Sequence, residues 1–440
     1  MRIAGWGGTT RQDCRVSHPR SEAEVAARIA EGHAIARGAG RAYGDAAQSA
    51  LNTVDMGRFD RMISFDAETG LLVAEAGVRL ADVIAAFLPR GWFPAVTPGT
   101  KHVSVGGMVA ADVHGKNHHR DGSFGAFVEF IDLMGPDGAV RRLTRGDNDE
   151  MFGWTLGGMG LTGVILRVGF RLRPVESGWI RQKSIVAGSL AEAMAAFEAN
   201  AGATYSVAWI DCLARGVAMG RSILMLGEHA SAAELPAERR AAPFGVPARR
   251  RLTVPFHAPG FALNGLTVRA FNHLYYAQGV KKAGESLVDW DSYFYPLDAI
   301  HGWNKIYGRR GFVQFQCAFP LATAEAGLAA LLTEISRAGQ GSFLAVLKRF
   351  GPQASRISFP MEGYTLALDF PLHARTTALL ERLDRITLAE GGRFYLAKDA
   401  RMTPHTLRKA DKRMAEFIAM RERTGLAEAF SSTQSERLAL

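Results

Sequence analysis

The feature that most constrains this sequence is the gathering of glycine into short loops before residue 165. The chain has 48 glycines among 440 residues, about one in nine, whereas roughly 7% is usual. Glycine adopts backbone conformations with positive φ and lets the main chain approach a ligand closely. We therefore expect the first part of the chain to fold around a bound molecule.

Length and composition exclude several classes of protein. A chain of 440 residues predicts two or three domains of ~150 residues each, and a hydrophobic content of 48% excludes disorder as the main state. No apolar run of about 18 residues predicts a membrane span, and the start of the chain lacks the apolar region of a secretory signal. We therefore expect a cytoplasmic or peripheral membrane protein. Three cysteines are too few for a disulfide framework: Cys14, Cys212 and Cys317.

Basic residues outnumber acidic residues, 52 Lys and Arg against 43 Asp and Glu. This balance favours phosphate-bearing partners or an anionic membrane surface. Nucleic-acid binding would need the basic residues clustered with stacking aromatic residues; here they are dispersed, so we expect no nucleic acid partner. Residues 231–286 are rich in Ala, Pro and Arg. We expect part of this stretch, with Arg249, Arg250 and Arg251, to be a mobile basic loop.

The first 176 residues mix short helices with many short strands. Ser21-Glu-Ala-Glu24 is a capping box and predicts a helix that ends near Gly32. Further elements follow from periodicity and turn residues: strands at 33–36, 71–77 and 164–172, a helix at 80–88, and a hairpin with strands at 127–134 and 139–143. The pattern indicates an α+β fold rather than regular βαβ units.

The second part of the chain alternates strands with longer helices. Strands are predicted at 311–319 and 363–370, and an alanine-rich helix at 189–199. Helices are also expected at 323–337 and 376–390, each opening on a threonine cap. Thr403-Pro404 predicts the start of another helix, with Thr as cap and Pro in the first turn.

Three glycine-rich stretches could carry chemistry. In the loop 37–45, successive N–H groups around Gly38 and Gly40 could form a nest for pyrophosphate, although an ordinary turn explains them equally well. Residues 97–107 and 112–125 would bring backbone and small side chains close to a planar cofactor. The second of these holds His114, His118 and His119, whose spacing is not that of a usual zinc site, so no metal is expected.

Residues 158–163 match the G-x-G-x-x-G pattern of dinucleotide-binding folds. That motif requires a strand before it and a helix after it. Here a strand is predicted to follow, and no acidic residue lies about 20 residues further on. We therefore favour a glycine turn that enters a strand over an NAD site.

Taken together, these motifs carry a resemblance. Arg37-Gly-Ala-Gly-Arg-Ala-Tyr-Gly-Asp45, Pro98-Gly-Thr100, Val105-Gly-Gly107, His114-Gly-Lys-Asn-His-His119 and Gly160-Leu-Thr-Gly163 are arranged as in flavin oxidoreductases of the vanillyl-alcohol-oxidase type. More narrowly, the chain resembles the decaprenylphosphoryl-β-D-ribose 2′-oxidase family, and the likeness resumes at Lys348-Arg-Phe-Gly351 and Ala397-Lys-Asp-Ala-Arg401. It spans nearly the whole chain.

The resemblance implies a fold and an activity. It implies an FAD-binding domain at 1–176, an antiparallel-sheet substrate domain at 177–392, and a C-terminal return to the FAD domain at 393–440. It implies oxidation of the 2′-hydroxyl of polyprenylphosphoryl-β-D-ribofuranose to a ketone, after which a separate NAD(P)H-dependent short-chain reductase completes epimerisation to the arabinose donor. The lipid-linked substrate implies attachment to a membrane surface.

The resemblance also assigns residues. The cofactor-binding set is Arg37, Gly38, Ala39, Gly40, Arg41, Ala42, Tyr43, Pro98, Gly99, Thr100, Ser104, Gly106, Gly107, Ala111, His114, Gly115, Asn117, His118, Gly160, Gly163, Val164 and Tyr395. The substrate set is Trp209, Gln314, Gln316, Lys348, Thr365, Ala367 and Lys398. The catalytic set is Lys398, His114, Tyr43 and Gln316. A desolvated lysine can act as a base, but Lys398 could instead stay charged and orient the hydroxyl or steady reduced flavin.

The sequence differs at three places from the patterns of the superfamily or the family. The loop 37–45 has no histidine, the residue that tethers flavin in many members of the superfamily, so we expect FAD to be non-covalent. Ala367 stands where mycobacterial-type members have the cysteine that nitroaromatic inhibitors modify, so we expect no covalent trapping. Thr365 replaces an asparagine near the sugar.

Other functions stay open on the sequence alone. An oxidase of free alditols or aldonolactones would share the FAD domain and would need no lipid-binding surface. A flavin-binding protein without turnover would not need Lys398 and Gln316.

Overall fold

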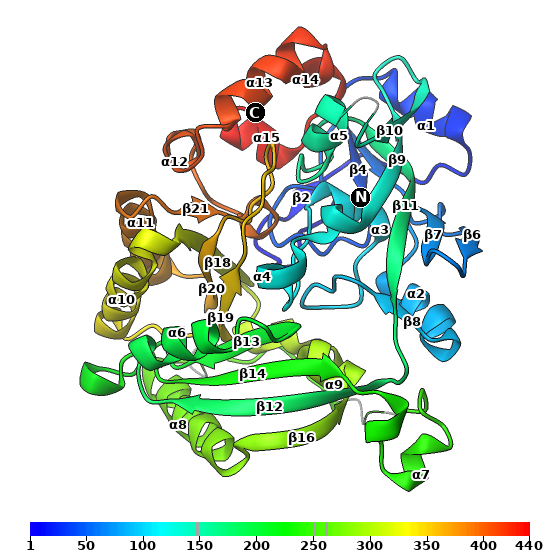
Figure 1. Ribbon diagram of the computed structural model, residues 1–440. Coiled ribbons are helices and arrows are strands. Elements are labelled where there is room, and N and C mark those ends of the chain that lie inside the picture. Colours follow the sequence, from blue (N-terminus) through cyan, green and yellow to red (C-terminus); the bar gives the residue numbers. More distant parts are fainter. Residues whose placement is uncertain (147–148, 248, 250–251, 260–262) are drawn as a thin grey trace.

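Three β-sheets of different construction organise the part of the chain that the computed structural model describes (Figure 1). That part comprises residues 1–146, 149–247, 249, 252–259 and 263–440. Arg250 and Arg251, which were expected in a mobile basic loop, lie outside it. Helices and strands are mixed along the chain, so the α+β prediction is confirmed.

The smallest of the three sheets is parallel and lies near the N-terminus. It has the order β3 (Val16–Ser17), β5 (Asn52–Asp55), β4 (Ala34–Arg37). Helix α1 (Glu22–Ile29) connects β3 to β4, and its N-cap Ser21 accepts a hydrogen bond from the Glu24 amide. The Ser21 cap is therefore present as predicted, but the capping box is incomplete, because the Glu24 carboxylate accepts from the Arg20 amide and not from that of Ser21. The helix buries Val25 and Ile29.

A six-stranded antiparallel sheet follows. Its order is β10 (Val140–Thr144), β9 (Val128–Met134), β11 (Val164–Pro174), β7 (Leu71–Glu75), β6 (Met62–Asp66), with β8 (Trp92–Pro94) paired to the end of β11. The predicted β9–β10 hairpin is present. Gly160 and Gly163, both at positive φ, form the turn that leads directly into β11. A strand and not a helix follows them, so the turn interpretation is confirmed over the NAD motif.

The largest sheet has eight strands, all paired antiparallel. Its order is β16 (Gly284–Asp289), β12 (Trp179–Ala187), β14 (Ser222–His229), β13 (Tyr205–Ile210), β19 (Ala345–Phe350), β20 (Gly363–Pro371), β18 (Phe312–Pro320), β21 (Arg393–Phe394). Two further pairs are short: β1 (Arg2–Ile3) with β2 (Gln12–Asp13), and β15 (Leu252–Thr253) with β17 (Ile300–His301).

Two long helices cover one face of the eight-stranded sheet, α10 (Leu321–Ala338) and α11 (Ala374–Ala389) (Figure 1). Their buried leucines belong to the same hydrophobic cluster as Phe315, Leu366 and Leu368 of the sheet. Each fully buried Leu or Phe stabilises the fold by about 1.5–3 kcal/mol. This side of the sheet is therefore structural, and we call it the apolar face.

The predicted caps of these two helices are wrong. Helix α10 is preceded by Pro320, and α11 is capped by His373. The hydroxyl of Thr323 instead donates to the carbonyl of Glu390, and that of Thr376 donates to the carbonyl of Pro371. Both threonines lie inside a helix, because each helix begins two residues before them. Thr403 does cap α12 (Pro404–Ala410) as predicted.

The described residues of 231–286 are partly helical, and the mobility of the basic loop around Arg249, Arg250 and Arg251 stays a prediction. The stretch holds α7 (Ala237–Arg240) and the 17-residue helix α8 (Gly265–Lys281), whose N-cap Asn264 accepts from two backbone amides. The Arg249 guanidinium donates to the carbonyls of Asp291 and Tyr295. Composition alone missed the Asn cap and this anchoring.

The C-terminal helices pack beside the N-terminal part of the chain (Figure 1). They are α12, α13 (Met414–Arg423), α14 (Leu426–Ala429) and α15 (Thr433–Leu438). Phe430 bridges Ala34 of β4, and the Ser431 amide donates to the Ala34 carbonyl. The remaining helices are α2 (Leu80–Phe87), α3 (Val105–Ala110), α4 (His118–Asp121), α5 (Asp149–Thr155), α6 (Leu190–Ala199) and α9 (Trp290–Phe294). Among the described residues, no helix has the length and apolar character needed to cross a membrane.

Candidate active site

The second face of the eight-stranded sheet carries polar side chains in register. Trp209, Val346, Ala367 and Gln316 lie directly opposite one another on four adjacent strands. Side chains two apart on a strand share a face, so the neighbouring pairs also belong here: Gln314 with Asp369, and Lys348 with Thr365. We call this side the polar face. It brings together all the residues predicted to contact substrate except Lys398.

Three side chains from outside the sheet meet the polar face. The Gln316 amide nitrogen lies 3.1 Å from Nε2 of His114, and the Gln314 amide donates to the Tyr43 hydroxyl at 3.4 Å. The ammonium of Lys398 lies 3.9 Å from the centroid of the Tyr43 ring. The structure therefore groups the four residues predicted as catalytic into one cluster.

Local backbone contacts hold Tyr43 against Lys398. The Tyr43 amide donates to the carbonyl of Ala397, the residue before the lysine. Gly44 approaches Asp399, the residue after Lys398, so closely that a Cβ on Gly44 would lie 2.0 Å from the Asp399 carbonyl oxygen. Only glycine fits there, which explains why Gly44 follows the tyrosine.

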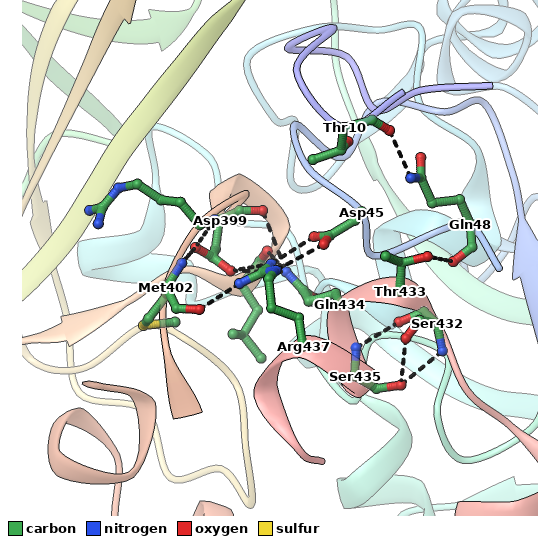
Figure 2. A network of polar contacts seen from close by, with 12 residues as sticks. Thr10, Asp45, Gln48, Asp399, Met402, Ser432, Thr433, Gln434, Ser435 and Arg437 are labelled. Atoms are coloured by element: carbon green, nitrogen blue, oxygen red, sulfur yellow. Dashed lines mark hydrogen bonds and ion pairs between the residues drawn. The ribbon is translucent and has the colours of Figure 1, made fainter. Parts of the chain in front are cut away.

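A polar network from the C-terminal helix fixes the same two segments (Figure 2). The Arg437 guanidinium on α15 donates to both oxygens of Asp45, at 2.7 and 2.9 Å, and to Asp399 at 2.8 Å. Asp45 lies two residues after Tyr43, and Asp399 follows Lys398 directly. Arg437 thus clamps the loop of Tyr43 to the segment of Lys398 without reaching either side chain.

The hydrogen bonds of His114 define its protonation. The Gln316 amide donates to Nε2 of His114 and to the hydroxyl of Thr365, and that hydroxyl donates to the carbonyl of Cys317. Nε2 is therefore an acceptor, and the proton of the neutral ring is on Nδ1. Burial, and then the charge of Lys348, hold the pKa of His114 well below its usual value. The Nδ1 atom is buried and has no partner among the described residues, so its N–H is available to a ligand.

Lys348 and Lys398 act on His114 by their charge, and Lys116 lies close enough to Lys348 to be affected by it. Burial lowers the pKa of Lys348 to about 8 and that of Lys116 to about 7, the latter with help from Lys348. Burial and the charge of Lys348 also lower the pKa of Lys398, whereas Asp369 opposes this shift. Burial raises the pKa of Asp369, which accepts a 2.6 Å hydrogen bond from Gln314. A lysine with a lowered pKa is partly neutral near pH 7 and can take up a proton.

The glycine loops have features that suit the diphosphate of FAD. Among the described residues, no acceptor pairs with the amide N–H groups of Gly40, Arg41 and Ala42. Gly38 lies against the loop of residues 97–107, since a Cβ there would be 1.9 Å from the Ser104 hydroxyl. Burial, and then the charge of Arg79, lower the pKa of Arg41. Unpaired N–H groups and an excess of positive charge are what an anion-binding nest needs.

Two other residues predicted to bind the cofactor hold the backbone of these loops by hydrogen bonds. The Arg37 guanidinium donates to the carbonyls of Ala4 and Ala47. The Asn117 amide donates to the carbonyl of Ala95 and to Asp121. These donor groups shape the loops, whereas the buried Oδ1 of Asn117 has no hydrogen-bond partner among the described residues.

The remaining predicted cofactor residues occupy several settings. Gly106 packs on Ala76, and Ala111 accepts a hydrogen bond from the Tyr395 hydroxyl at 2.9 Å. His118 is bonded to Gln353, and burial lowers its pKa to about 4. Gly107 lies in α3 and Val164 begins β11. The others lie on the loops or in the turn before β11: Ala39, Pro98, Gly99, Thr100, Gly115, Gly160 and Gly163.

Sequence reasoning missed Asp369, Tyr307, Lys116 and Arg437. Asp369 could have been found, because it lies two positions after Ala367 in a predicted strand and so shares its face. Lys116 stands inside the recognised His-Gly-Lys-Asn-His-His motif. Tyr307, beside Asp369, and Arg437 gave no local signal, because their importance comes only from contacts distant in sequence.

Comparisons with known proteins agree with this geometry. Residues 15–144 match the model of an FAD binding domain family. The chain is 36% identical to decaprenylphosphoryl-β-D-ribose oxidase of Mycolicibacterium smegmatis, over 100% of this chain and 97% of that protein. It is 34% identical to an uncharacterised protein of Streptomyces coelicolor, over 82% of this chain and 99% of the other. An uncharacterised oxidoreductase of Rhodococcoides fascians is 31% identical over 31% of each chain.

The full-length match covers both the loops before residue 165 and the polar face. FAD is thus the cofactor of this protein, and the protein is an oxidoreductase. The chain belongs to the decaprenylphosphoryl-β-D-ribose oxidase family of FAD-dependent enzymes.

Proposed function

We propose that this protein oxidises the 2′-hydroxyl of a polyprenylphosphoryl-β-D-ribofuranose to the ketone. The observation that carries the proposal is the position of Lys398, a desolvated lysine beside the polar face and within the cluster of Tyr43, His114 and Gln316. Bound FAD supplies the hydride acceptor for the carbon that is oxidised. The relative from M. smegmatis, whose name states the same type of substrate, supports the proposal.

Each residue of the cluster has a role in this proposal. Neutral Lys398 removes the proton of the hydroxyl, because an alkoxide releases hydride more readily than an alcohol. The Nδ1–H of His114 and the Gln316 side chain orient the sugar by hydrogen bonds. Lys348 keeps the pKa of Lys398 low by like charge and adds a cation near an anionic substrate. Trp209 lines the same face, with its indole N–H committed to the Phe343 carbonyl.

The proposal includes the organisation around the site. We propose that residues 1–176 and 393–440 form the FAD-binding part and residues 177–392 the substrate-binding part, with the sugar between them. Strand β11 ends at Pro174 and β12 begins at Trp179, which supports the first boundary. A separate NAD(P)H-dependent reductase would consume the ketone, and the enzyme would work as a peripheral protein at the membrane that holds its substrate.

Substrate discrimination tests this proposal. The purified FAD-loaded protein is mixed anaerobically with a short-chain prenylphosphoryl-β-D-ribofuranose, and the oxidised flavin band is followed. We expect bleaching by this compound and none by free ribose, alditols or aldonolactones. Bleaching by a free polyol and not by the lipid-linked sugar would replace the proposal with an alditol or aldonolactone oxidase.

The mode of FAD attachment has its own test. The loop 37–45 holds no histidine, so we expect FAD to be dissociable. Acid precipitation should leave the flavin in the supernatant, and a yellow pellet would contradict this expectation.

A further inference from the structure

Helix α8 presents several large apolar side chains to solvent, whereas α10 presents one, Leu321. Leu266 is 76% exposed and Leu274 is 62% exposed. They are eight residues apart, with exposed Ala270 halfway between them, so all three lie on one side of the helix. With exposed Arg269, Lys281 and Val280 they form a surface that we call the outer face of α8.

The opposite side of α8 is anchored to the protein. Asn272 is buried and donates to Asp211 at 2.7 Å, and the Tyr276 hydroxyl donates to the Ala187 carbonyl. Gly279 lies against Ile223 of β14 so closely that a Cβ would meet its side chain. The exposure of the outer face is therefore a stable property of a packed helix.

The stretch of sequence that contains α8 carries charge of a single sign, between Glu238 and Glu285. Between residues 239 and 284 the sequence holds eight Arg and Lys residues and no Asp or Glu, although acidic residues make up 43 of 440 in the whole chain. Exposed Arg269, Lys281 and Lys282 belong to this stretch. Cations beside exposed apolar side chains are the composition of surfaces that bind anionic lipid.

The helix lies at the edge of the candidate active site. Ile223 is opposite Trp209, so it belongs to the same row of the sheet as Ala367 and Gln316. On α8, Tyr275 contacts the Trp209 ring, with centroids 4.6 Å apart.

A run of aromatic rings continues from α8 to the catalytic cluster. The centroids of Phe271 and Phe343 are 5.6 Å apart, Phe343 and Tyr307 5.7 Å, Tyr307 and Phe312 4.5 Å, and Phe312 and Tyr43 5.4 Å. These contacts connect α8 to the catalytic cluster.

We propose that the outer face of α8 docks onto an anionic lipid surface, so that a lipid-linked substrate reaches the polar face without leaving the membrane. The biological purpose of the docking rests on the proposed function, but the docking itself does not, because vesicle binding needs no substrate. The apolar side chains would enter the lipid, and Arg269 and Lys281 of this face, with the adjacent Lys282, would contact the headgroups.

The test uses co-sedimentation of the FAD-loaded protein with vesicles. We expect binding to phosphatidylcholine vesicles that contain phosphatidylglycerol, and at least about tenfold weaker binding to phosphatidylcholine alone. The double variant Leu266→Glu/Leu274→Glu should weaken binding to the anionic vesicles by at least about tenfold. The matched control Ile63→Glu, an exposed apolar residue on β6, should bind like the wild type.

A second measurement separates this proposal from the proposed function. The double variant should retain its FAD, its melting temperature and its turnover of the short-chain soluble substrate. The docking proposal would be overturned if the wild-type protein did not bind anionic vesicles, or if the double variant bound them as the wild type does. Either result would count whatever the turnover shows. Loss of a wild-type dimer in the double variant, without vesicle binding by either protein, would assign the outer face to a second copy of this chain instead.

Discussion

The two faces of the eight-stranded sheet have opposite tasks although they are built from the same strands. On β18 and β20, Phe315, Cys317, Leu366 and Leu368 pack under the helices, while the residues that alternate with them carry amide, hydroxyl and carboxyl groups toward Tyr43, His114 and Lys398. Because successive side chains of a strand point to opposite faces, neighbouring residues contribute either to the stability of the fold or to the active site. Substitutions on the two faces should consequently have separable effects.

The largest effect is expected for the active-site lysine beside the polar face. Lys398→Ala should lower kcat by about 10²–10⁴-fold, the usual contribution of a positioned general base, with FAD content and melting temperature close to wild type. Steady-state turnover of the short-chain substrate and flavin absorbance measure these quantities. Wild-type turnover by a variant with full FAD content would refute the role of Lys398.

On the apolar face, Leu366→Ala should show the opposite pattern. Leu366 is fully buried in the main hydrophobic cluster, so its truncation should lower the free energy of unfolding by about 2–5 kcal/mol. Denaturant unfolding measures the loss. The folded fraction should keep nearly normal kcat; a selective loss of kcat without loss of stability would break the comparison of the two faces.

The clamp from α15 should affect both properties. Arg437→Met leaves the carboxylates of Asp45 and Asp399 without their shared partner, and loss of one partner of a buried ion pair costs about 3–5 kcal/mol. The residue is partly exposed, so we expect a smaller destabilisation of ~1–3 kcal/mol. Because the segments of Tyr43 and Lys398 lose their clamp, kcat should fall while KM changes little. Arg437→Lys should restore part of kcat, which a purely global loss of stability would not explain.

The pH dependence of turnover should reveal the charges on the polar face. Lys398 acts in its neutral form, so kcat/KM should rise with pH until its lowered pKa is passed. The charge of Lys348 lowers this pKa, so Lys348→Met should move the acid limb to higher pH, by up to about one unit. Asp369 raises it, so Asp369→Asn should move the limb to lower pH. Identical limbs in all three proteins would show that another group titrates.

The smallest effect is expected at Ala367. This residue lies opposite Gln316 and Val346 and is half-buried, so Ala367→Cys adds one sulfur atom at the edge of the site. We expect kcat to stay within about twofold, and the melting temperature within a few degrees. The new thiol should make the enzyme sensitive to covalent trapping by nitroaromatic inhibitors, which mass spectrometry of the intact chain would detect.

Much of the polar face could be predicted from sequence, because strand periodicity is local. Once 311–319 and 363–370 are predicted as strands, Gln314, Gln316, Thr365 and Ala367 follow as residues that share faces. The glycine loops were equally accessible, since Gly38 and Gly44 are required by close backbone approach.

The rest depended on contacts between distant residues. The cap of α10 was misplaced because Thr323 bonds to the carbonyl of Glu390, 67 residues away, and that of α11 because the helix begins two residues before Thr376. Arg437 lies 392 residues from Asp45 in sequence, so no local pattern could reveal the clamp. Helix α8 was missed because its apolar residues point outward, against the periodicity on which helix prediction relies.

The most direct test of the central claim is the rate of flavin reduction measured by rapid anaerobic mixing with the short-chain prenylphosphoryl-β-D-ribofuranose across a range of pH. We predict that the wild-type rate rises with pH to a plateau, and that Lys398→Ala reduces its flavin much more slowly with no such rise. Equal rates and equal pH dependence in the two proteins would contradict the assignment of Lys398 as the base on the polar face.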